Sequence, residues 1–246
     1  MFPLVHYYVN TKIFAHPTSL MVLGGIFPDL ASGMGLERNA AHQMGVSLFT
    51  YCQEHQPQAI DFARGVLSHG IIPRGVDYYA DESWPGCEKG WCFEQGKPWL
   101  KQLQQVTGLP NHLLWWKSHN FVEIGCELLT HAAHPGLNHQ LLQALQDRQA
   151  LTEAAAILAA YSGCNAQKAV DVFLQTPNIF ALHSIDPFSL AQKQAISFAN
   201  RHNIHNCDIN GMARLLEQIS DSLTDQYQPF MDQILSLVAE NLRPYQ

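Results

Sequence analysis

The sequence predicts an all-α protein, an irregular bundle of about ten helices that form one domain over residues 1–246. Apolar residues recur at intervals of three and four along the chain, as expected for helices with one buried face. No sustained alternation of apolar and polar residues bounded by hairpin turns predicts strands. Hydrophobic residues make up 47% of the 246 residues, which is enough for a substantial buried core.

Proline-containing breaks separate the expected helices of the first half. Pro28, Pro57 and Pro73 cannot donate a backbone hydrogen bond, so each is expected to end or kink the helix before it. The expected helices cover residues 3–14, 18–25, 40–54, 57–71, 97–106 and 111–132. Residues 81–98, rich in Gly, Pro and Trp, form the longest expected irregular segment, which is typical of a functional lid or a flexible insertion.

The second half reads as amphipathic helices rich in Ala, Leu and Gln. Gly163 and Pro177 are among the residues expected to end them. These helices cover residues 138–147, 150–162, 165–175, 187–202 and 208–241. Because histidines and aromatic residues crowd into residues 1–148, we expect that half to carry the functional site and residues 149–246 to support it.

Composition limits the classes of ligand. Lys and Arg total 14 against 21 Asp and Glu, so the formal net charge is −7 and long nucleic acids are not expected as partners. The 13 histidines are the more informative excess, since imidazole is the commonest metal ligand. The first residues lack the features of a signal peptide, and no apolar run approaches the length of a transmembrane helix, so a cytoplasmic location is expected.

The segment "SHNFVEIGCELL" contains the strongest local signal. His119 and Glu123 are four residues apart, so on a helix both side chains point from one face and can bind one ion together. A surface hydrogen bond between them is the alternative. Glu127 lies one further turn along the same face, as a third ligand or as a partner that orients His119.

The segment "LSHGIIPRGVDYYAD" adds His69 at the end of an apolar helix. Pro73 cannot donate the hydrogen bond that the His69 carbonyl would otherwise accept, so the helix should end there. Asp77 and Asp81 follow, and one helical turn would align their carboxylates. Either aspartate is a candidate ligand, and a solvated turn in which Arg74 pairs with Asp77 is the alternative.

Three further residues come from separate segments of the first half. His6 lies among aromatic residues in "LVHYYVN", where a buried, hydrogen-bonded histidine is the alternative to a ligand. Asp29 ends the apolar run "MVLGGIFPDL", where a helix N-cap is the alternative. His42 lies early in an expected helix and is a candidate ligand if it faces inward.

Together these segments supply only histidine and carboxylate side chains. The predicted metal ligands are His6, Asp29, His42, His69, Asp77, His119 and Glu123. Nitrogen and oxygen ligands of this kind suit zinc, manganese or iron, in a centre of two or three ions. Such centres activate a water molecule and stabilise both oxygens of a displacement on phosphorus, so phosphoester hydrolysis is the expected chemistry.

The order of these motifs resembles the zinc-dependent phospholipase C family, which includes the P1-type nucleases. The resemblance covers residues 1–130: an early histidine, a Gly-x-x-x-Pro-Asp turn ending at Asp29, a histidine opening the next helix, a glycine-containing apolar helix ending in His69, and the pair in "HNFVE". It implies a phospholipase C-type helical fold. The interval of eight residues between His69 and Asp77 is longer than the four usual in the family.

The resemblance also implies roles for the ligands. His42, His69 and Asp77 would share one ion, and His119 and Glu123 would hold a second. Asp29 would be the catalytic residue beside the attacking water. His6 would belong to a third, more exposed position.

Two functions from different classes are therefore expected. The first is a metal-dependent phosphoester hydrolase that acts on a small or lipid-like phosphoester through a metal-activated water. The second is a non-enzymatic helical binding or scaffold protein with structural histidines, in which residues 208–241 bury an apolar face against a partner or in a homodimer. That face is equally suited to cover the core of its own domain.

Overall fold

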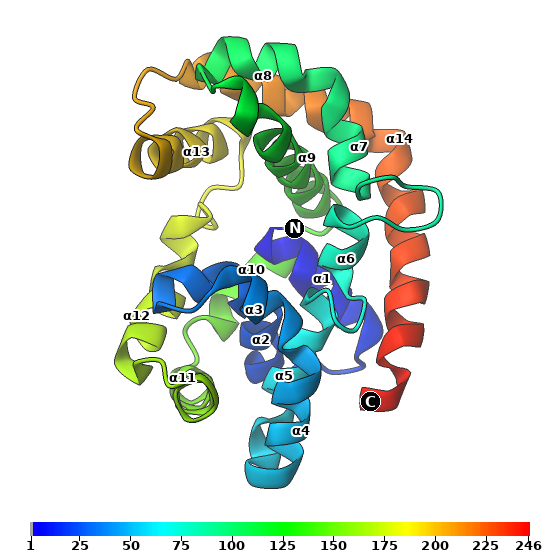
Figure 1. The fold of residues 1–246 in the computed structure, drawn as a ribbon, viewed down its shortest axis with the longest axis vertical. Helices are drawn as coiled ribbons and strands as arrows, with labels where there is room; N and C mark the ends of the chain where they lie inside the picture. Colours follow the sequence, from blue (N-terminus) through cyan, green and yellow to red (C-terminus); the bar gives the residue numbers. More distant parts are fainter. Residues whose placement is uncertain (1) are drawn as a thin grey trace.

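The computed structural model describes residues 2–246, and every regular element among them is a helix (Figure 1). The all-α prediction is confirmed. The helices are α1 (Pro3–Ile13), α2 (Ser19–Met34), α3 (Arg38–Gln43), α4 (Gly45–His55), α5 (Ile60–His69), α6 (Val76–Asp81), α7 (Trp91–Gly96), α8 (Leu100–Thr107), α9 (Asn111–Ala133), α10 (Leu137–Ala144), α11 (Arg148–Ser162), α12 (Ala166–Ile179), α13 (Pro187–His202) and α14 (Ile209–Leu242). Short 3₁₀ turns cover Pro57–Ala59, Lys97–Trp99 and Arg243–Tyr245.

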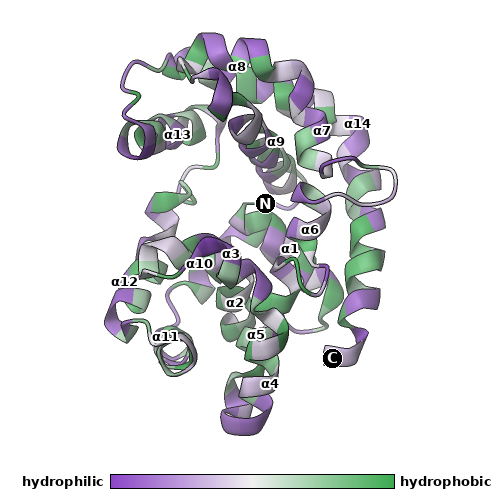
Figure 2. Cartoon of the chain, viewed as in Figure 1, coloured by the Kyte–Doolittle hydropathy of each residue, from purple (hydrophilic) through white to green (hydrophobic). Residues whose placement is uncertain are grey.

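Two helices organise the packing. The buried helix α2 contacts α1, α3, α5, α10, α11 and α12. The longest helix, α14, runs along one side of the molecule in Figure 1 and packs against α9 and α13. Hydrophobic and hydrophilic bands alternate along α14 in Figure 2, and its apolar face, which includes Leu216, Ile219 and Ile234, is buried by the chain itself.

Several expected helix ends are wrong. Pro28 does not end a helix, because α2 continues through it to Met34, and Pro177 likewise lies inside α12. In both helices the loss of one backbone hydrogen bond is outweighed by burial of the helix on its neighbours. Asp29 therefore lies within α2 and not at an N-cap. The expected helix 40–54 is divided at Met44 into α3 and α4, and the segment expected to be irregular contains α7.

The contact between α2 and α5 brings the two backbones unusually close. A Cβ atom on Gly24 would lie 2.0 Å from the carbonyl oxygen of Phe62, and one on Gly65 would lie 2.1 Å from that of Met21. Any larger residue at either position would force the helices apart. The glycines therefore set the separation of two helices, one of which carries Asp29 near its C-terminal end while the other ends in His69.

No helix in residues 2–246 is both long and apolar enough to cross a membrane.

We expect Gly24→Ala to lower the free energy of unfolding by about 2–3 kcal/mol or more, because the new methyl group overlaps backbone that cannot move independently. Gly136→Ala is the matched control, since no atom lies within 4 Å of its added Cβ. Urea unfolding followed by circular dichroism measures both. Equal stability of the two variants would contradict the close packing of α2 on α5.

Candidate metal centre

Four predicted ligands converge in a first group, Asp29, His42, His69 and Asp77, which come from α2, α3, α5 and α6. Asp77 Oδ2 lies 3.0 Å from His69 Nε2 and 3.2 Å from His42 Nε2, and the two Nε2 atoms are 3.3 Å apart. Asp29 Oδ1 lies 3.7 Å from His42 Nε2. Ligands held about 2.0–2.1 Å from one tetrahedral ion are about 3.3 Å from each other, so these four atoms have the spacing of a coordination shell.

Backbone carbonyls orient both imidazoles of the first group. His69 Nδ1 donates to the carbonyl of Gly25 at 2.7 Å, and His42 Nδ1 donates to the carbonyl of Arg38 at 2.8 Å. Each bond places the proton on Nδ1 and leaves Nε2 directed at the carboxylates. This arrangement is typical of metal-binding histidines, whose second nitrogen donates to a carbonyl or carboxylate.

A second group consists of Asp81, His119 and Glu123, from α6 and α9. The sequence left Asp77 and Asp81 as alternatives, and the structure places one in each group, because they lie one turn apart on α6. The ring of Phe93 stacks on His119 with centroids 4.3 Å apart and excludes water from that side.

Within the described residues, two buried polar atoms of the second group lack a partner that a cation could supply. Among residues 2–246, His119 Nδ1 and Asp81 Oδ1 have no hydrogen-bond partner although both atoms are buried. Unsatisfied buried polar atoms are rare in proteins and commonly mark a missing ion or water. The donor set of two carboxylates and one imidazole fits zinc, manganese or iron.

The pKa shifts in the second group also favour a bound cation. Burial and the neighbouring carboxylates of Glu123 and Asp77 raise the pKa of Asp81 well above its usual range. Burial lowers the pKa of His119 to about 4, so its ring is neutral and available as a ligand at neutral pH. Repulsion between buried carboxylates is relieved by a bound cation, so the group is suited to one.

The first group is electrostatically different. Burial alone would raise the pKa of Asp77, but the charge of His69 and the nearby His6 and His42 hold it well below its usual range. Burial would lower the pKa of His42, but hydrogen bonds to Asp29 and Asp77 raise it to about 10. The histidines of this group therefore partly neutralise its carboxylates in the absence of an ion.

His6 does not occupy an exposed position, so that expectation is wrong. Its side chain is 1% exposed, and its ring stacks on that of His69 with centroids 3.7 Å apart. His6 Nε2 lies 3.4 Å from Asp77 Oδ1 and 3.9 Å from Asp29 Oδ2. The packing of α1 against α2 and α5 carries it into the first group as an additional imidazole.

Glu127 has a different role from the two considered in the sequence. Its carboxylate accepts hydrogen bonds from the backbone N–H groups of Leu4, at 3.0 Å, and Val5, at 3.2 Å. It therefore caps the N-terminus of α1 and fixes the helix that carries His6. Burial raises the pKa of Glu127 to about 8 despite these bonds.

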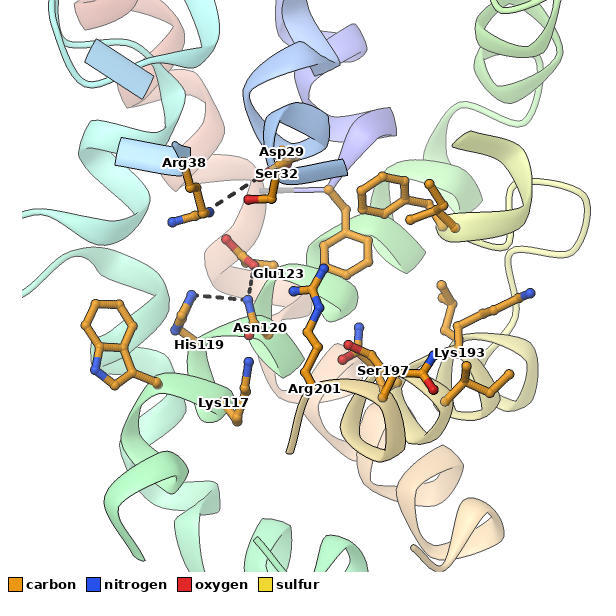
Figure 3. Close-up of a pocket in the computed structure, with 18 of the residues that line it drawn as sticks. Asp29, Ser32, Arg38, Lys117, His119, Asn120, Glu123, Lys193, Ser197 and Arg201 are labelled. Atoms are coloured by element: carbon orange, nitrogen blue, oxygen red, sulfur yellow. Dashed lines mark hydrogen bonds and ion pairs between the residues drawn. The ribbon is translucent and has the colours of Figure 1, made fainter. Parts of the chain in front are cut away.

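A cavity of about 560 Å³ opens beside both groups (Figure 3). Asp29, His119 and Glu123 line it, so these three candidate ligands are accessible to a small molecule. Two lining residues were missed in the sequence. Arg38 reaches toward Asp29, with its Nη2 atom 3.7 Å from Oδ1, and Asn120 donates to Glu123 Oε2 at 2.9 Å. Arg38 lies one turn before His42 on α3, and that spacing could have indicated from the sequence that Arg38 lies near the site.

The fold and these groups define an all-helical protein with a candidate metal centre at the edge of a cavity. No family model, no curated protein and no solved structure matches the chain.

Metal analysis tests the two groups separately. Protein purified without a histidine tag and reconstituted with zinc should bind about two equivalents, and His69→Ala and Asp81→Asn should each lose about one. The exposed His16 is the control, since His16→Ala removes an imidazole outside both groups. Full metal content in both His69→Ala and Asp81→Asn would show that these side chains are not ligands.

The raised pKa of His42 predicts a pH-dependent stability of the metal-free protein. Because its folded-state pKa of about 10 exceeds the ordinary 6.5, its contribution is fully present below pH 6.5 and is lost as the pH rises through 10. Wild type should therefore be more stable than His42→Asn near neutral pH, with a difference in unfolding free energy that narrows toward pH 10. Urea unfolding in the presence of a chelator measures it, and a difference independent of pH would contradict the His42 contacts with Asp29 and Asp77.

Proposed function

We propose that the protein is a metal-dependent phosphoester hydrolase of the zinc-dependent phospholipase C type. One observation carries the proposal: two groups of histidine and carboxylate ligands share helix α6 and lie beside one cavity. Adjacent metal sites that share an opening are typical of enzymes that act on phosphoesters. The sequence motifs that resemble this family supply all of the residues in both groups except Asp81.

Zinc, or manganese or iron, would be held by the two groups and would supply Lewis acidity toward phosphate oxygens and water. The first group offers His42, His69, Asp77 and Asp29, with His6 stacked against it. The second offers Asp81, His119 and Glu123.

Asp29 would orient the attacking water. Its side chain is 15% exposed, in contrast to the nearly inaccessible Asp77, and it lines the cavity. Burial would raise the pKa of Asp29, but the hydrogen bond from His42 and the charge of His69 hold it below its usual range. Asp29 therefore remains ionised and can accept a hydrogen bond from water.

Arg38 completes the reacting end of the cavity. Its side chain is half exposed and extends over Asp29, where a guanidinium can hydrogen-bond two phosphate oxygens at once. It would thus balance the negative charge on the phosphate oxygens as the bond to the leaving group breaks.

The substrate is a small or lipid-like phosphoester. Phe2, Ile179 and Phe180 give the cavity an apolar wall, and its volume of about 560 Å³ is in the range of small-molecule sites. The net charge of −7 disfavours extended nucleic acids. The same chain buries the apolar face of α14 that the scaffold alternative would need for a partner.

We expect zinc-loaded wild type to hydrolyse simple aryl phosphate mono- or diesters or a short-chain phospholipid, and Asp29→Asn to lower kcat/KM by about 100-fold or more. The control Asp232→Asn removes an exposed carboxylate on α14, far along the chain from both groups. Metal analysis of Asp29→Asn should still find the ion of the second group. Zinc-loaded wild type with no activity toward any of these phosphoesters would rule out the proposal.

A further inference from the structure

The cavity has a second polar end, made of cations. Lys117 on α9 and Arg201 and Lys193 on α13 line it together with neutral polar side chains. Within residues 2–246, no carboxylate oxygen lies within 4.0 Å of the charged nitrogens of these three residues. Charged side chains directed into a cavity without a partner are a natural site for a ligand of opposite charge.

Lys117 and Arg201 line one cavity from two different helices, α9 and α13. Figure 3 shows Arg201 extending from α13 into the cavity, with Lys117 reaching into it from α9. An anion between the two helices would be attracted to both side chains.

Lys117 lies apart from the reacting end. Asn120 lies between Lys117 and Glu123 in Figure 3, whereas Arg38 lies with Asp29 on the opposite side of Glu123. Arg38 thus already provides a cation for a phosphoester at the metal groups. Apolar side chains of Ile179 and Ile196 line the same cavity, so the space can accept a ligand with an apolar linker.

We propose that Lys117 and Arg201 bind a second anionic group of the substrate, a phosphate or a carboxylate, separate from the phosphoester that is hydrolysed. This inference rests on the proposed function for the reacting end of the cavity. Lys193, further along the same wall, adds positive charge. The substrate class is therefore a phosphoester that carries a second acid, either as a soluble metabolite or as an anionic lipid.

Two substrates that differ only in the second acid test this inference. Zinc-loaded wild type should hydrolyse 6-phosphonooxyhexanoate with a kcat/KM at least about tenfold above that of hexyl phosphate. Lys117→Ala and Arg201→Ala should remove that preference and leave hexyl phosphate hydrolysis within about twofold. Lys101→Ala, a change of equal charge at an exposed residue of α8 outside the cavity, should behave as wild type.

Binding to the metal-free protein provides a readout that does not depend on hydrolysis. Trp116 lines the cavity and is 52% exposed, so its fluorescence should report occupancy. Inorganic pyrophosphate at low ionic strength should change the fluorescence of wild type and Lys101→Ala, whereas Lys117→Ala and Arg201→Ala should bind it at least about tenfold more weakly. Trp116→Phe should lose the signal.

The outcomes separate the two proposals. Pyrophosphate binding that depends on Lys117 and Arg201, without hydrolysis of any phosphoester, would support the anion site and reject the hydrolase. The anion site would be overturned if wild type hydrolysed 6-phosphonooxyhexanoate no better than hexyl phosphate. It would also be overturned if Lys117→Ala and Arg201→Ala lowered kcat/KM equally for both substrates. Dihexanoyl phosphatidylserine compared with glycerophosphoserine then distinguishes the sources: a higher kcat/KM for the acylated compound identifies a lipid, and a lower one identifies a soluble ligand.

Discussion

The close contact between α2 and α5 is the constraint on which the candidate centre depends. Gly24 and Gly65 let the two backbones meet without intervening side chains. At that separation the carbonyl of Gly25 on α2 can accept the hydrogen bond from His69 on α5, and this bond directs the free nitrogen of His69 at Asp77. Packing of two apolar helices thus determines the orientation of His69, a candidate metal ligand.

Two further features of the fold also fix the positions of the candidate ligands. Glu127 on α9 caps α1 and so fixes the helix that stacks His6 on His69. The single turn of α6 delivers Asp77 to the first group and Asp81 to the second, so movement of α6 would alter both. His6, His69, Asp77 and Glu127 are buried almost completely. Burial of so many ionisable groups is unfavourable unless their charges are compensated. In the first group the histidines compensate in part, whereas in the second the carboxylates repel one another.

Local pattern predicted the helices and the chemistry of the ligands, but not their three-dimensional relations. The pair His119 and Glu123 follows from helical spacing alone. The continuation of α2 through Pro28 does not, because it depends on burial against helices distant in sequence. Whether His6 was exposed depended likewise on the packing of α1. Assignment of Asp77 and Asp81 to different groups required the position of α9 relative to α6.

The distribution of charge shows most clearly why composition alone does not predict which ligands a protein binds. The chain carries a net charge of −7, and its 14 lysines and arginines argue against a polyanionic partner as a whole. Yet four of those cations, Arg38, Lys117, Lys193 and Arg201, line one cavity. A ligand responds to the local potential, which a cleft with low-dielectric walls concentrates, and not to the total charge. An acidic protein can therefore present a basic site, and the residues that create it come from helices α3, α9 and α13, which only the tertiary structure brings together.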